Sequence, residues 1–248
     1  MRSETYKKAY NLVNSNLEIL QKSDMNCMIV LSKAGLGKTT MVLETMKQKG
    51  CQLGDHYLYF NSYFTPLAFY QALVETTKLK APQILILDDV ELILKDKNII
   101  NLLKAATWQS GHDRIVCYST TSKKVKETKI NFTGKIILLL NEIPPKNPMF
   151  NAILDRSLFV GLEFNNQQIL ELMENEIVPK NYKNLSFQQR QKVFNYIKKI
   201  TTSTTDLSFR TLIKAYNYFM FSPHNWQELV RKTLSENSNQ SNKLKIII

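Results

Sequence analysis

The order of apolar and polar positions predicts strands and helices in alternation over the first two thirds of the chain. Apolar side chains recur at helical spacing in 4–21, whereas a short apolar run such as 25–32 is typical of a buried strand. The run at 84–90 is apolar up to its acidic end, which indicates a strand covered on both faces of a parallel sheet. In chain order we expect strands at 25–32, 56–61, 84–90, 114–120, 135–140 and 158–164, and helices at 4–21, 38–48, 66–74 and 98–107.

The pattern changes after Phe164, because the longer segments beyond it have apolar residues at helical spacing only. Ser186, with Gln189 three positions later, is the capping-box signal that opens one of these helices. The expected helices are 165–177, 186–200, 207–221 and 225–234. We therefore predict an α/β domain at 1–164, an all-helical domain at 165–236 and a disordered polar tail at 237–248.

Composition restricts the class of protein. The chain has 248 residues, of which 44% are hydrophobic and 22% charged, so it is not wholly disordered. Its three cysteines lack CxxC spacing, which excludes a disulfide scaffold and favours a reducing compartment: the cytoplasm, a nucleoid or an organelle matrix. No apolar run approaches the roughly 20 residues of a membrane span, and the start lacks the apolar core of a secretory signal. We expect neither a membrane partner nor secretion.

The charge points toward a polyanionic partner without proving one. Lys and Arg number 33 against 21 Asp and Glu, which gives a net charge of +12. Such a balance favours nucleic acid as the partner. Only six of the basic residues are arginine, however, so a lysine-rich solvated surface or an AT-rich genome is an alternative source of the same excess.

The segment from Ser32 to Thr40 predicts a phosphate-binding loop, because it follows an expected strand and opens an expected helix. Gly35 and Gly37 let backbone N–H groups converge on phosphate oxygens, and the helix that follows adds its N-terminal dipole. Lys38 would neutralise the β- and γ-phosphates, and the Thr39 hydroxyl would bind Mg²⁺. The predicted nucleotide-binding residues are Ser32, Lys33, Ala34, Gly35, Leu36, Gly37, Lys38, Thr39 and Thr40.

A second motif makes it much less credible that the segment from Ser32 to Thr40 is an ordinary strand–turn–helix with this sequence by chance. The strand ending at Asp88 and Asp89 lies 50 residues after Lys38 (88 − 38) and places two carboxylates at the edge where open α/β sheets bind ligands. Asp88 would hold Mg²⁺ through water, and Asp89 would orient or activate the attacking water. The two motifs together predict a site for a nucleoside triphosphate and Mg²⁺.

With these motifs, the chain resembles the AAA+ ATPases over about residues 5–225. The resemblance implies a three-layer α/β P-loop NTPase domain with a mostly parallel central sheet, followed by a small helical lid. It also implies three further site residues: Asn141 as sensor 1, Arg156 as an arginine finger acting on a neighbouring subunit, and Arg210 as sensor 2. Each has a plain alternative, namely a turn residue, a surface ion pair and a helix-face charge.

The chain departs from the family pattern at two positions. Ser32 stands where the loop usually has its first glycine, and Asp89 stands where the family usually has glutamate. The shorter carboxylate reaches less far, so hydrolysis is expected to be slow.

The segment 121–134 is basic and lies between two expected strands. Strand, basic turn and strand predict a hairpin, which resembles the pre-sensor-1 hairpin of AAA+ replication motors and superfamily III helicases. In a ring such hairpins grip nucleic-acid phosphates, and the alternative is a solvated loop. The candidate contacts are Lys123, Lys124, Lys126 and Lys129.

Three hypotheses follow for function. The first is an AAA+ ATPase acting on nucleic acid, DNA more than RNA, as a replication initiator, helicase loader or small motor. Its partners would be further copies of the chain, in an oligomer or ring, and possible helicases or other replication proteins. The second is a protein-remodelling AAA+ enzyme, against which the lack of an aromatic-glycine dipeptide after 84–90 argues mildly. The third is a weakly hydrolysing scaffold or switch, suggested by Asp89.

Overall fold

The computed structural model describes residues 3–61, 63–108, 113–119, 127–144 and 147–246, with side chains described as far as 236. The chain divides into two compact units. The sheet unit comprises Tyr10–Lys33 and Lys38–Leu162, and the helical unit comprises Met1–Ala9, Ala34–Gly37 and Glu163–Ile248. Among the described residues, no helix combines the length and the apolar character needed to cross a membrane.

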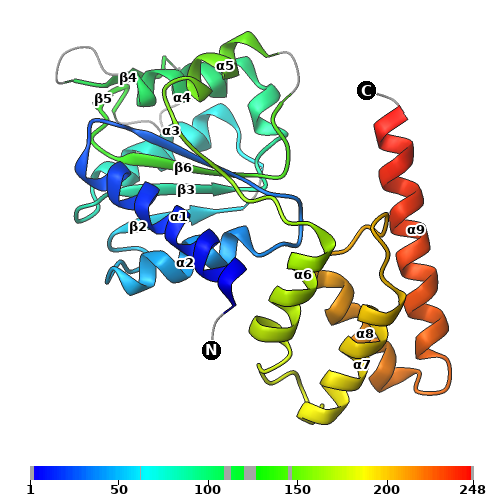
Figure 1. The fold of residues 1–248 in the computed structure, drawn as a ribbon. Helices are drawn as coiled ribbons and strands as arrows, with labels where there is room; N and C mark the ends of the chain where they lie inside the picture. The colour runs from blue at the N-terminus through cyan, green and yellow to red at the C-terminus, as the bar shows by residue number, and fades with distance from the viewer. Residues whose placement is uncertain (1–2, 62, 109–112, 120–126, 145–146, 247–248) are drawn as a thin grey trace. The chain divides into compact units, whose positions relative to one another are not determined.

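The sheet unit is built on five parallel strands in the order β2-β3-β6-β1-β7, as the sequence predicted for an α/β fold (Figure 1). The strands pair in register along the sheet, for example Ile29 with Leu138 and Leu85 with Ile136. The long crossovers between them follow from the parallel arrangement, because a parallel neighbour cannot be reached by a tight turn. The bounds are β1 Cys27–Leu31, β2 Tyr57–Phe60, β3 Ile84–Asp88, β6 Lys135–Leu140 and β7 Leu158–Gly161.

Helices cover both faces of this sheet and make three layers (Figure 1). Alternate strand residues such as Ile29 and Leu138 share one apolar cluster with residues of α3 (Pro66–Thr77), α4 (Lys97–Thr107) and α5 (Pro148–Leu154). The residues between them on the strands point to the opposite face and are equally buried. That second face is covered by α1 (Glu4–Lys22) and α2 (Lys38–Gln48), whose inward residues Val13, Leu17, Val42 and Met46 are fully buried.

The predicted hairpin forms between other strands than expected. Ile115–Cys117 (β4) pairs antiparallel with Lys129–Asn131 (β5), whereas 135–140 enters the central sheet as β6. The expectation of a hairpin from 114–120 to 135–140 was therefore wrong. The apolar run at 135–140 is buried on both faces, which suits a central parallel strand, and the three-residue β5 was too short to be recognised from its pattern. Phe132, just after β5, is fully buried beneath the Arg114 guanidinium.

The helical unit contains α6 (Asn166–Leu172), the π-helical turn Met173–Ile177, α7 (Phe187–Ile200), α8 (Phe209–Phe221) and α9 (Trp226–Ile246). Their apolar faces meet in one cluster that includes Phe194, Tyr216 and Trp226. The expected disorder of 237–248 was wrong for most of that segment, since α9 continues through Ile246. Extending an existing helix needs no new nucleation, and Ser and Asn disfavour it by less than about 1 kcal/mol each.

The two units do not coincide with contiguous stretches of sequence. The change to the helical unit falls at Glu163, but the first nine residues and the loop tip Ala34–Gly37 also group with that unit. Thr5 donates a hydrogen bond to Glu171 at 2.5 Å, and Leu36 is buried in the helical core cluster. A pattern read along the chain does not reveal such grouping, because it depends on contacts between distant residues.

Candidate nucleotide-binding site

The predicted phosphate-binding loop connects the end of β1 at Leu31 with the start of α2 at Lys38. Gly35 and Gly37 have φ angles of +77° and +84°, the left-handed region that L side chains rarely adopt. Space is also restricted, because a Cβ on Gly35 would lie 3.2 Å from Arg210 Cγ, and one on Gly37 would lie 3.2 Å from Phe209 Cε2. Both positions therefore require glycine.

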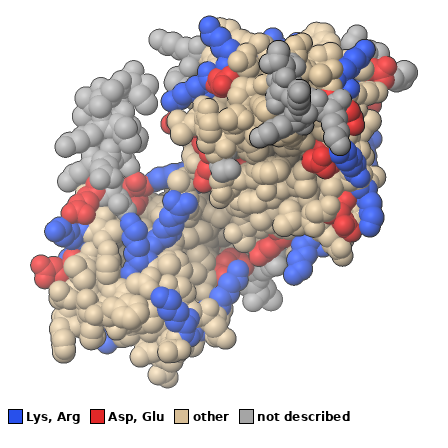
Figure 2. Space-filling view, turned by 180° about the vertical axis from the view of Figure 1, so that it is seen from behind, with Lys and Arg blue, Asp and Glu red and all other residues tan. Residues whose placement is uncertain are grey.

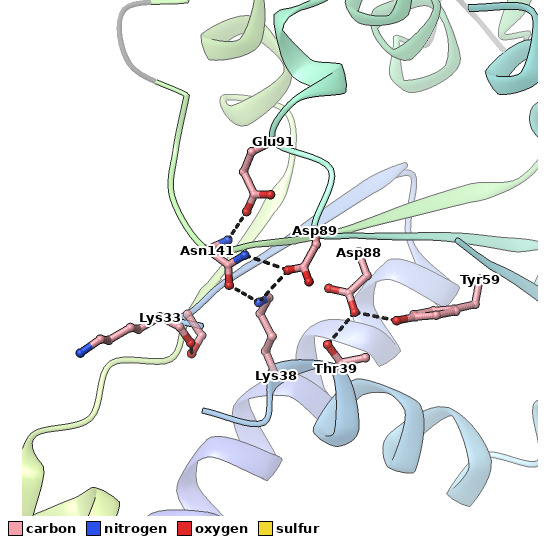
Figure 3. Close-up of polar contacts among 9 residues, drawn as sticks. Lys33, Lys38, Thr39, Tyr59, Asp88, Asp89, Glu91 and Asn141 are labelled. Carbon is pink, nitrogen blue, oxygen red and sulfur yellow. Dashed lines mark hydrogen bonds and ion pairs between the residues drawn. The ribbon is translucent and has the colours of Figure 1, made fainter. Parts of the chain in front are cut away.

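Lys38, Asn141 and Asp89 form a connected polar network at one edge of the sheet (Figure 3). Lys38 Nζ donates to Asn141 Oδ1 at 2.6 Å and lies 3.6 Å from Asp89 Oδ1. Asn141 Nδ2 donates to Asp89 Oδ1 at 2.8 Å. The three residues meet because β3 and β6 are neighbouring parallel strands, so their carboxyl ends lie at the same edge as the start of α2.

Asp88 is buried and offers an unused oxygen beside the loop. Its Oδ2 accepts hydrogen bonds from the hydroxyls of Thr39 and Tyr59, each at 2.7 Å (Figure 3). Its Oδ1 is also buried and receives no hydrogen bond from any residue that the structure describes. A buried carboxylate oxygen without a donor is costly unless a cation satisfies it. Mg²⁺ prefers carboxylate and hydroxyl oxygens, so Asp88 and Thr39 fit the ion that the loop motif implies.

Tyr59 was missed in the sequence analysis. It lies on β2, the strand next to β3, and its hydroxyl donates to Asp88. Burial, together with that hydrogen bond and the negative charge of Asp88, raises the pKa of Tyr59, so the hydroxyl remains a donor at neutral pH. A tyrosine in a short β-rich segment resembles an ordinary core residue, and only the order of the strands reveals its partner.

Glu91 is a second residue of the site to which the sequence analysis gave no role. Its Oε1 accepts a hydrogen bond from the Asn141 backbone N–H at 2.5 Å (Figure 3). The chain turns sharply just before it, because Asp89 has a φ of +52°. This left-handed turn places a third acidic residue beside the sheet edge, and a period-two strand pattern does not predict it.

The other predicted loop residues have varied surroundings. Ser32 is buried and donates its backbone N–H to Leu140 O at 3.1 Å, whereas Ala34 and Thr40 are exposed. Lys33 points away from the Lys38 network (Figure 3). Leu36 is buried among residues of the helical unit.

The two predicted arginines lie in different places. Arg210 is an exposed residue of α8 whose side chain runs alongside Gly35, within the helical unit. Arg156 follows α5 in the sheet unit, and its guanidinium lies 3.7 Å from the centre of the Trp108 ring. Arg156 is thus not part of the network around Lys38, and its predicted role on a neighbouring subunit stays a prediction.

The predicted nucleic-acid lysines are described only in part. Lys129 is exposed at the start of β5, whereas Lys123, Lys124 and Lys126 lie outside the described residues. On the face drawn in Figure 2, Lys and Arg side chains are scattered among Asp and Glu side chains and do not form one patch. On this face, surface charge alone does not single out one region.

Comparison with known proteins supports the fold. No family model matches the chain. An uncharacterized 36.7 kDa protein of Enterobacteria phage T4 is 24% identical over 246 residues, 92% of this chain and 74% of that protein. The replication initiator DnaA bound to AMPPCP and single-stranded DNA matches with a TM-score of 0.52 and 17% identity, covering 93% of this chain and 66% of that one.

This chain thus spans slightly less than two thirds of that initiator. Domain III of the Thermotoga maritima replication initiation protein DnaA matches with a TM-score of 0.50 and 16% identity, covering 94% of this chain and 93% of that one. At these identities the likeness concerns the fold. The chain has the fold of the AAA+ P-loop ATPase domain of the DnaA initiators.

Proposed function

We propose that this chain binds ATP with Mg²⁺ and hydrolyses it. The observation that carries this proposal is the buried Asp88 carboxylate beside Thr39, with one oxygen that no described residue satisfies. Next to it, Lys38 lies at the start of a helix, where phosphate is favoured by both the ammonium group and the helix dipole. The initiator that shares the fold was solved with the ATP analogue AMPPCP, which agrees with this assignment.

Each residue of the network has a proposed role in hydrolysis. When ATP binds, Lys38 leaves its contacts with Asp89 and Asn141 and contacts the β- and γ-phosphates instead. The Asp89 carboxylate is then free to contact the attacking water. Water attacks the γ-phosphorus, a new P–O bond forms, and the bond to the oxygen that bridges the β- and γ-phosphorus breaks. Asp89 accepts the proton of the water, and ADP leaves with the bond's electron pair. Thr39 and Asp88 would hold Mg²⁺, which would neutralise part of the phosphate charge.

We further propose that Asn141 orients the water and that two arginines complete the site. Arg210 lies beside the loop at Gly35 and would contact the phosphates of the nucleotide bound to its own chain. Arg156 would act on the nucleotide of a neighbouring copy, which requires an oligomer or ring. Arginine supplied in this way stabilises transition-state charge and contributes about 10³- to 10⁵-fold in P-loop enzymes.

The proposed substrate of the ATP-driven work is nucleic acid, DNA more than RNA. The net charge of +12, the basic segment 121–134 and the shared fold with a DNA-bound replication initiator support this reading. The role is then that of an initiator, a helicase loader or a small motor.

Replacing Lys38 by Ala tests the nucleotide site. Loss of hydrogen bonds to charged phosphates should weaken ATP binding by about 10- to 150-fold and abolish turnover. Lys47→Ala, at an exposed position of the same helix, is the matched control and should leave both unchanged. Fluorescent-nucleotide titration measures binding, and phosphate release measures turnover with and without single-stranded DNA. Unchanged turnover in Lys38→Ala would remove the site assignment, and no response to DNA would remove the nucleic-acid part.

A nucleotide-dependent switch is the second candidate function. Asp89 is the shorter carboxylate and is already engaged by Lys38 and Asn141, so water activation has to compete with these contacts. Tight ATP binding with negligible turnover in the same assay selects this candidate, and multiple turnovers exclude it.

A further inference from the structure

Helix α4 presents a face that the proposed nucleotide chemistry does not use. Asn98, Asn101, Ala105 and Trp108 follow one another at spacings of three or four residues, so they line one side of the helix and its C-cap. At 1.5 Å per residue the row is about 15 Å long. Each of the four is exposed or half-buried.

Two open cavities lie along this face, both within the sheet unit. The first has a volume of about 610 Å³ and is lined by Lys104, Trp108, Asp113, Ile115 and Arg156, among others. The second, of about 360 Å³, is lined by Asn98, Asn101, Cys117 and Tyr118, and the two cavities share Ala105. Volumes of this order are those of small-ligand sites. Because the two cavities share Ala105, we refer to them together as the α4 groove.

Trp108 is the aromatic side chain among the described lining residues of the first cavity. The planar Arg156 guanidinium lies 3.7 Å from its ring centre, so a ring face already accepts a flat, delocalised group. Trp108 nevertheless remains 50% exposed. A nucleobase has the same flat shape, and stacking on an aromatic side chain is the general way in which proteins hold unpaired bases.

The charges of the groove suit an anion. Among the lining residues that the structure describes, Lys104 and Arg156 are the cations. The Asp113 carboxylate accepts a hydrogen bond from Asn131 Nδ2 at 2.6 Å and keeps its negative charge, so the described charged groups of this cavity leave an excess of one positive charge (2 − 1). Farther along, the amides of Asn98 and Asn101 supply donors and acceptors of the kind that read base edges. An aromatic platform beside cations and amides matches a base with its phosphate better than it matches an apolar protein segment.

We infer that the α4 groove binds single-stranded nucleic acid, with a base stacked on Trp108 and a backbone phosphate at Lys104. A single strand is required because the bases of a duplex are already stacked and paired. The inference rests on the nucleic-acid part of the proposed function and adds a site distinct from the lysines of 121–134. Arg156 is omitted from the test variants because it is also proposed to act on a neighbouring subunit.

Tryptophan fluorescence tests the inference directly. The chain has two tryptophans, and Trp226 is buried, so in a Trp226→Phe variant the emission comes from Trp108. Titration with fluorescently labelled oligothymidylate should quench this emission. The midpoint of the quenching curve should equal the midpoint obtained from the fluorescence anisotropy of the label. Trp108→Ala should weaken binding by about 5- to 150-fold, the range expected for one stacked base, and Trp108→Phe should restore most of it. Phe159→Ala removes a ring of similar exposure from the same unit and should change nothing.

Cys117 gives a second measurement that does not depend on Trp226→Phe folding. Cys117 is exposed in the second cavity, whereas Cys27 and Cys51 are buried. Burial raises the pKa of the Cys27 thiol to about 12 and raises that of Cys51 as well, which leaves Cys117 as the accessible thiol of the three. Bound oligothymidylate should slow the labelling of Cys117 by a thiol reagent. Lys104→Gln should reduce the slope of log affinity against log salt by about 0.7.

The possible results separate this inference from the proposed function. If oligothymidylate binds without quenching Trp108, without protecting Cys117 and equally well to Trp108→Ala, the α4 groove is not its site, while the function in nucleic acid stands. If no oligonucleotide binds at low salt, both fail. If Trp108→Ala changes the oligomeric state in sedimentation and leaves DNA affinity intact, the groove is a protein contact and the inference is overturned.

Discussion

At the scale of single residues, the candidate site joins a buried cation to a carboxylate and an amide oxygen. Lys38 is almost fully buried, and it is compensated by Asp89 and by the Asn141 amide oxygen. A phosphate that bound Lys38 would therefore change the contacts of Asp89. Asp89 itself has a φ of +52°, a conformation that is costly for most residues but is tolerated by Asp and Asn.

Replacing Asp89 by Asn should separate binding from turnover. Asn suits the left-handed backbone and keeps an oxygen for Lys38 and Asn141, but it removes the negative charge opposite Lys38. The melting temperature should therefore fall slightly, while ATP binding is retained. The amide cannot accept the proton of the attacking water, and turnover should fall by about 10²- to 10⁴-fold. Nucleotide titration, phosphate release and thermal denaturation measure the three quantities. Glu91→Gln is the control for removal of a nearby carboxylate, and an equal loss of turnover in both variants would show that Asp89 is not the specific base.

At the scale of elements, the sequence was most informative where an apolar run ended in a polar residue. The strands that end at Asp88 and before Asn141 could be predicted, and so could their meeting at one edge, because neighbouring parallel strands end together. Tyr59 and Glu91 could not be predicted, since one depends on strand order and the other on a left-handed turn. The short β5 and the seven-residue α5 escaped the pattern because neither has enough residues to show a period.

Helix starts were another kind of element that the sequence specified locally. The capping box predicted at Ser186 is present, with Ser186 N–H donating to Gln189 Oε1 at 2.8 Å and Gln189 N–H donating to Ser186 Oγ at 3.2 Å. Both bonds lie within four residues and need no tertiary contact, which explains why the signal was readable.

Replacing Ser186 by Ala should therefore lower the unfolding free energy of the helical unit by about 1 kcal/mol, within a range of about 0.5–2 kcal/mol. Trp226 is buried in this unit against Tyr196 and Phe219, so its fluorescence follows unfolding in urea once Trp108 has been replaced by Phe. Ser203→Ala, at an exposed turn, is the control and should shift the midpoint far less. Equal shifts in the two variants would contradict a capping role.

At the scale of the whole molecule, the net charge of +12 has to be divided between specific contacts and general surface. The face in Figure 2 carries its cations in scattered positions, which is what a compositional excess of lysine produces. Two groups of cations are candidates for specific contacts, namely the lysines that the sequence places in 121–134 and the cations of the α4 groove. Total charge sets the strength of non-specific attraction, whereas only contacted cations change the number of counterions released on binding.

Salt dependence can therefore show whether the lysines of 121–134 touch nucleic acid. Replacing Lys123, Lys124, Lys126 and Lys129 by Gln should reduce the slope of log affinity for single-stranded DNA against log salt by up to about 3, because each phosphate contact contributes about 0.7. The control replaces four exposed lysines elsewhere, Lys7, Lys47, Lys95 and Lys214, and changes the net charge equally. If charge acted only as a general field, both variants would lose the same affinity for DNA. That result would favour the alternative interpretation, in which the basic segment is a solvated loop. A smaller slope in the first variant alone would make the segment a contact surface, because counterion release depends on where cations meet phosphates.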